Sequence, residues 1–292
     1  MTTVAPVSDS LSDQTRLWKL RLTVEADSTF PVPKSDGYAL YGALLSTISD
    51  GDEGAASHIH DADTAQIRNS GLQGEFGDSE HRFQKRILAD GTYHLSVGLF
   101  PEDEHGVYDA LTRSLAIDRR PIPLEHGDLH VTELESETTT CSELLARADA
   151  LDARSIQFKF QTPTCIEDAP DITTMFPARG PVFGSILGKW RSTAPSALDL
   201  PVDRETVEAS LIEKPEFDVC DTHSVVVNRA TRENGETKPI KMQGFTGTCE
   251  YQFKNESPAV RNAITALALF AEYSGVGSAV ARGCGTVRTD FR

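Results

Sequence analysis

The chain of 292 residues is 39% hydrophobic and 25% charged, which is typical of a globular protein. No apolar run reaches the roughly 18 residues that a membrane-spanning helix needs, and residues 1–14 lack the basic and apolar regions of a signal peptide. These features exclude a helical membrane protein, and we expect a cytoplasmic protein.

The chain carries a formal net charge of -16, from 44 acidic and 28 basic residues. Its acidic residues are spread along the sequence, and only 9 of the basic residues are lysines. Such a surface either keeps a protein soluble or adapts it to high salt, and we favour the second interpretation. The net charge argues against a nucleic-acid ligand, although basic residues gather locally at Arg82, Lys85 and Arg86 and between residues 179 and 191.

The first half of the chain predicts the element order β-α-β-β-α-β. Residues 17–26 alternate apolar and polar side chains, which indicates a strand, and residues 34–48 present one apolar face at helical spacing. The later elements are predicted strands at 66–72 and 92–100, a helix at 102–115 and a strand at 122–134. This order is that of one ferredoxin-like unit.

The second half repeats the plan after a polar, helix-forming linker at 138–153. Its predicted elements are a strand at 155–161, helices at 181–190 and 204–213, paired strands at 217–228 and 242–253, a helix at 258–273 capped by Ser257, and a strand at 285–291. We therefore expect an α+β fold with two tandem ferredoxin-like domains, at 15–137 and 154–292, after a polar tail at 1–14.

Four glycines, Gly275, Gly277, Gly283 and Gly285, stand close together in the segment SGVGSAVARGCG. A dinucleotide or phosphate loop would need a strand before the glycines and a helix after them, and here the order is reversed. Glycine permits positive backbone dihedrals and close approach of a ligand. The segment predicts a structural loop that can contact a ligand.

Several segments with this loop resemble the Cas-six family, the RAMP-type endoribonucleases that process CRISPR repeat RNA. In the second half the matching segments, in the family's order, are FKFQTPTCI, FPARGPVFGSILGKW, MQGFTGTCEYQF and AEYSGVGSAVARGCGTVR. The first half matches less closely, at residues 40–45, at HIHD and at TYHLSVGLF.

This resemblance implies that the facing surfaces of two ferredoxin-like domains hold an RNA repeat. The four glycines would contact RNA and order the domain interface, and Arg282 would contact a phosphate. From their local charge we add Arg179, Lys189 and Arg191 as RNA-binding candidates. The implied partners are CRISPR repeat RNA and other Cas subunits of an effector complex that retains the processed RNA.

The implied reaction is metal-independent attack of a ribose 2'-hydroxyl on the adjacent phosphorus, which leaves a 2',3'-cyclic phosphate and a 5'-hydroxyl. Histidine is suited to proton transfer near neutral pH. In SHIHDAD, His60 followed by Asp61 resembles the family's catalytic histidine position, so we predict His60 as the general acid or base, with His58 as its rival.

Supporting roles at the site are predicted for a serine, a tyrosine and a lysine. Ser70 could donate a hydrogen bond to the phosphate, and Tyr38 could orient the ribose; Tyr41 falls on the apolar helix face. Lys34 could stabilise the transition state. No metal or other cofactor is predicted, because the five cysteines are scattered without a CxxC pair and no HExxH motif occurs.

Two other functions compatible with the sequence remain. The first is a non-cleaving RNA-binding RAMP subunit, which keeps the fold and the glycine-rich loop without catalysis. The second is a regulatory module that binds a small molecule on tandem ferredoxin-like domains.

Overall fold

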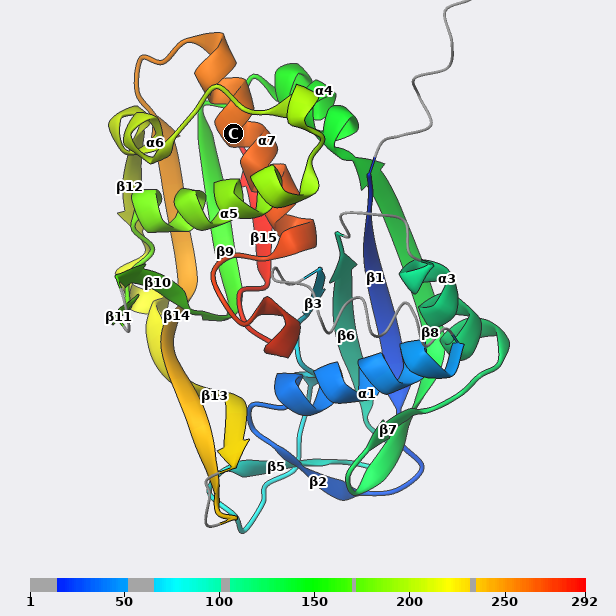
Figure 1. Ribbon diagram of the computed structural model, residues 1–292. Helices are drawn as coiled ribbons and strands as arrows, with labels where there is room; N and C mark the ends of the chain where they lie inside the picture. The colour runs from blue at the N-terminus through cyan, green and yellow to red at the C-terminus, as the bar shows by residue number, and fades with distance from the viewer. Residues whose placement is uncertain (1–14, 52–65, 101–105, 170–171, 232–234) are drawn as a thin grey trace, which may run out of the picture.

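The computed structural model describes residues 15–51, 66–100, 106–169, 172–231 and 235–292. Its two main sheets are antiparallel and lie side by side, each with its own helices (Figure 1). None of the described helices is long and apolar enough to cross a membrane.

The N-terminal sheet has the strand order β3-β6-β1-β8-β7, and β4 pairs with β6. Its central strand forms because Leu20, Leu22 and Val24 alternate with polar residues and are buried beneath α1 and α3. The elements are β1 (Arg16–Glu25), α1 (Gly37–Gly51), β3 (Ile67–Asn69), β4 (Gln73–Gly74), β6 (Thr92–Leu99), α3 (Val107–Thr112) with a π-helical turn (Arg113–Ile117), β7 (Ile122–Leu124) and β8 (Gly127–Thr140).

The C-terminal sheet has the order β12-β14-β9-β15, with β13 paired to β14. Phe158 and Phe160 of its central strand β9 pack under α5 and α7 in the largest core cluster. The elements are β9 (Ser155–Thr164), α5 (Arg179–Thr193), α6 (Arg204–Ser210), β12 (Leu211–Pro215), β13 (Asp221–Thr231), β14 (Thr237–Phe253), α7 (Pro258–Ser274) and β15 (Val287–Phe291).

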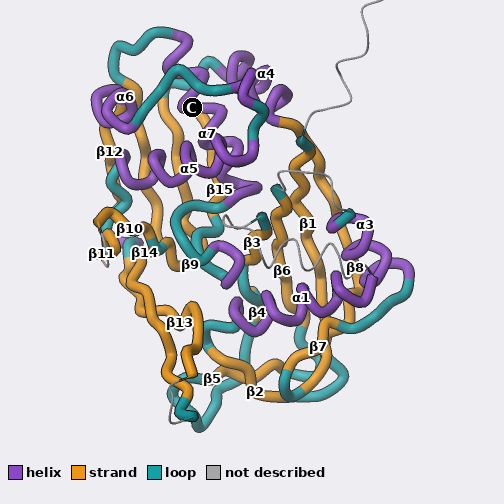
Figure 2. Tube along the Cα trace, in the orientation of Figure 1, coloured by secondary structure: helices purple, strands orange, loops and turns teal. Residues whose placement is uncertain are grey.

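In both sheets the four main strands follow the spatial order second, third, first and fourth. This antiparallel order, with two helices on one face, is the ferredoxin-like arrangement. The helices α1 and α5 lie on the same side of the two sheets, as Figure 2 also shows. The predicted α+β fold of two tandem ferredoxin-like units is confirmed.

Several boundaries differ from those predicted. Residues 122–134 form a hairpin of β7 and β8 instead of one strand, because the chain turns at Glu125–His126. β8 runs on to Thr140, where α4 (Cys141–Leu151) begins with a capping box between Thr140 and Glu143. The helix predicted at 204–213 ends at Ser210, and its last residues belong to β12. The strand predicted to start at residue 217 begins at Asp221, after a 3-10 turn.

Two small two-stranded sheets were not expected. β2 (Phe30–Pro33) pairs with β5 (Gln84–Ile87), and β10 (Ile166–Ala169) pairs with β11 (Ile172–Thr174). Prolines in β2 and the charged residues of β5 hide the strand pattern. In Figure 1 the pair β2 and β5 lies next to the far end of the β13–β14 hairpin.

Candidate functional site

The glycine-rich loop between α7 and β15 needs its glycines for backbone conformation. Gly275, Gly277, Gly283 and Gly285 have φ angles of 69°, 81°, 88° and 68°, a region that side chains with a Cβ rarely adopt. A Cβ on Gly285 would lie 1.9 Å from the carbonyl oxygen of Val276, so the loop is also folded tightly against itself. All four glycines therefore have a structural role that only glycine can fill.

This loop packs against the N-terminal domain where α1 begins. A Cβ on Gly37 would lie 2.4 Å from the Cα of Gly283. The amide of Asn69 fixes this contact: its Nδ2 donates to the carbonyl oxygens of Ala281 (2.5 Å) and Gly37 (3.2 Å), and its Oδ1 accepts from the N–H of Gly71 (2.9 Å). Asn69 is completely buried, so one side chain holds the loop, α1 and the turn after β3 together.

The preceding residue, Arg68, crosses the same junction. Its guanidinium donates to the carbonyl oxygen of Tyr273 (3.2 Å), to Thr286 Oγ1 (3.1 Å) and to Ser96 Oγ (3.0 Å). Burial lowers the pKa of Arg68 to about 10, so the guanidinium stays protonated at neutral pH. β3 is therefore attached by consecutive side chains to the end of α7 and to the glycine-rich loop.

Beside this junction a cleft of roughly 670 Å³ lies between the domains. Three of its cations, Lys34 before α1, Lys159 on β9 and Arg282 in the glycine-rich loop, form no ion pair with any other described residue. They come from both domains, in a chain whose formal net charge is -16. The cleft thus gathers unpaired positive charge and can bind an anion.

A fourth cation in the cleft, Lys85 on β5, is held by a buried carboxylate. Its Nζ lies 2.9 Å from Asp36 Oδ2 and 3.6 Å from the centre of the Phe76 ring. Asp36 also accepts from the N–H of Leu72. Burial raises the pKa of the Asp36 carboxyl, and the ammonium of Lys85 opposes this shift.

The predicted catalytic residues are placed as follows. The ring centre of Tyr38 lies 5.8 Å from the guanidinium carbon of Arg282, so these two residues come together at the cleft. Ser70 lines the cleft but is buried, and its hydroxyl donates to the carbonyl oxygen of Gly71 (2.7 Å) and accepts from the N–H of Ser96 (2.9 Å). His60 and His58 lie outside the described residues.

The three basic residues predicted from local charge lie elsewhere. Lys189 is buried, and its Nζ donates to the carbonyl oxygens of Ser274 (3.3 Å) and Gly275 (3.0 Å). Burial lowers the pKa of Lys189 to about 7. Arg179 pairs with Glu213, and Arg191 donates to the carbonyl oxygen of Val202 (3.2 Å). Lys189 thus donates hydrogen bonds to the start of the glycine-rich loop. The side chains of both arginines bind groups within the C-terminal domain.

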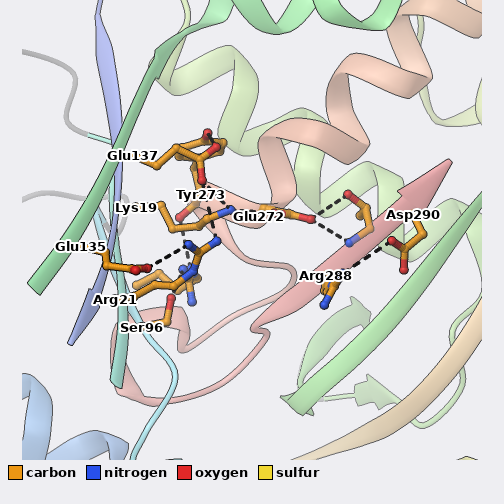
Figure 3. A network of polar contacts seen from close by, with 11 residues as sticks. Lys19, Arg21, Ser96, Glu135, Glu137, Glu272, Tyr273, Arg288 and Asp290 are labelled. Carbon is orange, nitrogen blue, oxygen red and sulfur yellow. Dashed lines mark hydrogen bonds and ion pairs between the residues drawn. The ribbon is translucent and has the colours of Figure 1, made fainter. Parts of the chain in front are cut away.

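A second groove between the domains, of roughly 730 Å³, is lined by acidic as well as basic side chains. Two of its cations are paired with carboxylates: Lys19 Nζ lies 2.7 Å from Glu272 and 3.3 Å from Glu137, and Arg21 Nη1 lies 3.4 Å from Glu135. The guanidinium of Arg68, which also lines the groove, is buried and donates to neutral oxygens. Figure 3 shows these side chains pointing toward one another between β1, β8 and α7. The second groove therefore offers little free positive charge to an anion.

Sequence reasoning missed the residues that build the junction and one cation of the cleft. Gly37, Arg68, Asn69 and Lys159 carry no motif of their own, and each acquires its role from a partner distant in the chain. The one available signal was the run Arg-Asn-Ser-Gly at residues 68–71, whose polar residues sit in a predicted strand where apolar ones are usual.

Comparisons with known proteins agree with this geometry. Residues 158–287 match the family model described as CRISPR-associated endoribonuclease Cas6, and no curated protein matches the chain. A solved Cas6 product complex is 19% identical with a TM-score of 0.68, over 94% of this chain and 100% of that one.

Two other solved structures have the same fold. Thermus thermophilus Cas6 is 18% identical with a TM-score of 0.61, over 94% of this chain and 99% of that one. A Cas6-related protein from Pyrococcus furiosus is 10% identical with a TM-score of 0.57, over 95% and 98% of the two chains. Residues 158–287 thus resemble the Cas6 family in sequence, and the chain as a whole has the fold of solved Cas6 structures.

Proposed function

We propose that the protein is an endoribonuclease that processes CRISPR repeat RNA bound in the cleft between its two domains. The observation that carries this proposal is the convergence of Lys34, Lys159 and Arg282 at the glycine-rich loop. Phosphate is the anion that three unpaired cations along a cleft suit best, and a strand of RNA presents phosphates in series. The solved relatives include a Cas6 product complex and a Cas6 substrate mimic complex, in line with an RNA ligand.

The RNA would pass through the cleft and not through the second groove. In the second groove the carboxylates of Glu133, Glu135 and Glu137 stand on one face of β8 and would repel phosphates. In the cleft, Arg282 is next to Tyr38, so the guanidinium and the ring can contact the same nucleotide.

The proposed reaction is attack of a ribose 2'-hydroxyl on the adjacent phosphorus, which gives a 2',3'-cyclic phosphate and a 5'-hydroxyl. His60, or its rival His58, would transfer the proton as general acid or base. A cation such as Lys34 or Arg282 would stabilise the negative charge that develops on the phosphoryl oxygens. No step of this reaction requires a metal ion. Afterwards the enzyme would keep the processed RNA for an effector complex of Cas subunits.

The test is incubation of the protein with RNA of the repeat from its own genome's CRISPR array, in high salt with EDTA, followed by mapping of the product ends. We expect one cut that leaves a cyclic phosphate, and its loss in His60→Ala with retained binding. Retained cleavage in His60→Ala but not in His58→Ala would transfer the role to His58. Binding without any cut by folded wild-type protein would favour the non-cleaving RNA-binding subunit, and no binding would refute the proposal.

A further inference from the structure

One phenylalanine next to the cleft is exposed to solvent between two cations. Phe83 is 67% exposed and stands at the end of a tight turn, before β5. The guanidinium carbon of Arg82 lies 5.2 Å from the centre of its ring, and Nζ of Lys241 lies 5.7 Å from it. Arg82 belongs to the N-terminal domain, and Lys241 belongs to β14 of the C-terminal domain. Two domains thus place positive charge around one exposed ring.

No described carboxylate neutralises either cation. Within the described ranges, Arg82 and Lys241 form no ion pair, although Asp78 and Glu80 closely precede Arg82 in the chain. In an acidic chain, cations that stay unpaired around an apolar ring are best explained by a ligand that is both anionic and aromatic. A nucleotide has both properties, because it carries a phosphate and a flat base.

The exposed ring of Phe83 is adjacent to the cleft. The N–H of Lys34 donates to the carbonyl oxygen of Phe83 (2.9 Å), and Lys34 is one of the unpaired cations of the cleft. A strand of RNA in the cleft can therefore reach Phe83 without leaving the cationic surface. In Figure 1, β5, the strand that directly follows Phe83, lies beside the far end of the β13–β14 hairpin.

We propose that Phe83, Arg82 and Lys241 form a stacking platform for one unpaired nucleotide of the bound RNA. The base would lie on the ring, and the two cations would hold the flanking phosphates. Bases inside a duplex are already stacked on their neighbours, so this platform selects a single-stranded part of the substrate. This inference rests on the proposed function and adds to it the kind of RNA that the cleft requires beside the cut.

The chain offers a matched control for the ring. Phe217 is 72% exposed and also lies near the cleft, but its sequence neighbours are Glu216 and Asp218. It has the same side chain and a similar exposure, with negative charge in place of positive charge. A purely apolar contribution of exposed phenylalanine would affect RNA binding equally at both positions.

The test measures binding of fluorescein-labelled repeat RNA by anisotropy, with wild type and with Phe83→Ala, Phe83→Leu, Phe83→Tyr and Phe217→Ala. Base stacking on an aromatic side chain corresponds to about 5- to 150-fold in affinity on substitution by alanine. We expect such a loss for Phe83→Ala, a similar loss for Phe83→Leu, and affinity near that of wild type for Phe83→Tyr and Phe217→Ala.

A second test changes the RNA instead of the protein. Replacing each unpaired nucleotide by an abasic one should weaken binding to wild type at one position and leave binding to Phe83→Ala unchanged there. Unchanged affinity in Phe83→Ala, or full affinity in Phe83→Leu, would overturn the platform while leaving RNA binding by the wild type intact. Failure of the wild type to bind RNA would instead overturn the proposed function, and the platform with it.

Discussion

The backbones of Gly37 and Gly283 touch across the domain junction: a Cβ on Gly37 would lie 2.4 Å from the Cα of Gly283. Gly37 belongs to the first turn of α1, and Gly283 belongs to the glycine-rich loop of the other domain. Real Cβ atoms essentially never come within 3.0 Å of a neighbouring atom. The close approach of the two domains therefore depends on the absence of a side chain at Gly37.

The substitution Gly37→Ala should push apart the backbones of Gly37 and Gly283. Because the methyl group would meet backbone atoms on the other side, we expect a loss of about 1–3 kcal/mol in the free energy of unfolding, typical of overpacking. Gly42→Ala is the control in the same helix: nothing lies within 4 Å of the added Cβ, and alanine favours a helix interior by about 0.5–1 kcal/mol. Urea denaturation of both variants measures the difference, and equal stabilities would contradict the close contact.

Asn69→Asp should destabilise the junction in a pH-dependent way. The carboxylate keeps the bond from the N–H of Gly71 but faces the carbonyl oxygens of Ala281 and Gly37, to which the amide donates. A buried carboxylate that faces two carbonyl oxygens has a raised pKa, so the loss of stability should be greatest at pH 7 and smaller near pH 4, where the acid is protonated. Asn228→Asp is the control, because the Oδ1 of Asn228 accepts from the N–H of Arg229. A loss that does not vary with pH would refute this account.

Lys189→Met tests whether Lys189 is a buried support. The folded-state pKa of about 7 lies below the ordinary value of 10.5, so between these limits the unfolded chain binds a proton that the folded chain lacks. The free energy of unfolding of wild type, measured relative to Lys189→Met, should therefore rise with pH from about 7 to 10.5 and be constant below 7. Denaturation at several pH values gives this difference, and a flat profile would speak against burial of the ammonium.

Arg282→Gln should weaken RNA binding and also its dependence on salt. A cation that contacts one phosphate contributes about 0.7 to the slope of log affinity against log salt for a single strand. We expect the slope to fall by about this amount in Arg282→Gln. Arg288→Gln is the matched control, because Arg288 lies in the second groove within 3.9 Å of Asp290. Equal slopes for both variants would show that Arg282 does not contact a phosphate.

The parts of the fold that the sequence predicted are those with a regular pattern. β1 and β9 were predicted within a few residues because their buried residues alternate, and α7 because Ser257 and Pro258 mark its start. β5 was not predicted, since Lys85 and Arg86 in a four-residue strand give no apolar alternation. Its strand character comes from pairing with β2, which is a tertiary effect.

The site shows the same limit. Arg282 was predicted from a local motif, and the structure places it at the cleft, next to Tyr38. Lys189 stands two residues before Arg191 in a basic segment, yet its ammonium is buried under the glycine-rich loop while the side chain of Arg191 is half exposed. Charge along the sequence cannot distinguish these environments, because burial is decided by which elements pack together.

The β13–β14 hairpin has one further consequence. It belongs to the C-terminal sheet, but Lys241 lies against Phe83 of the N-terminal domain, far along the chain from the contact of Gly37 with Gly283. The domains thus meet at two separate places, and rotation about either one would disturb the contact at the other. We therefore expect these two contacts to define the gap between the domains before any RNA binds. Binding would not have to supply energy for closure, and RNAs would be selected by whether their shape fits an opening of constant width.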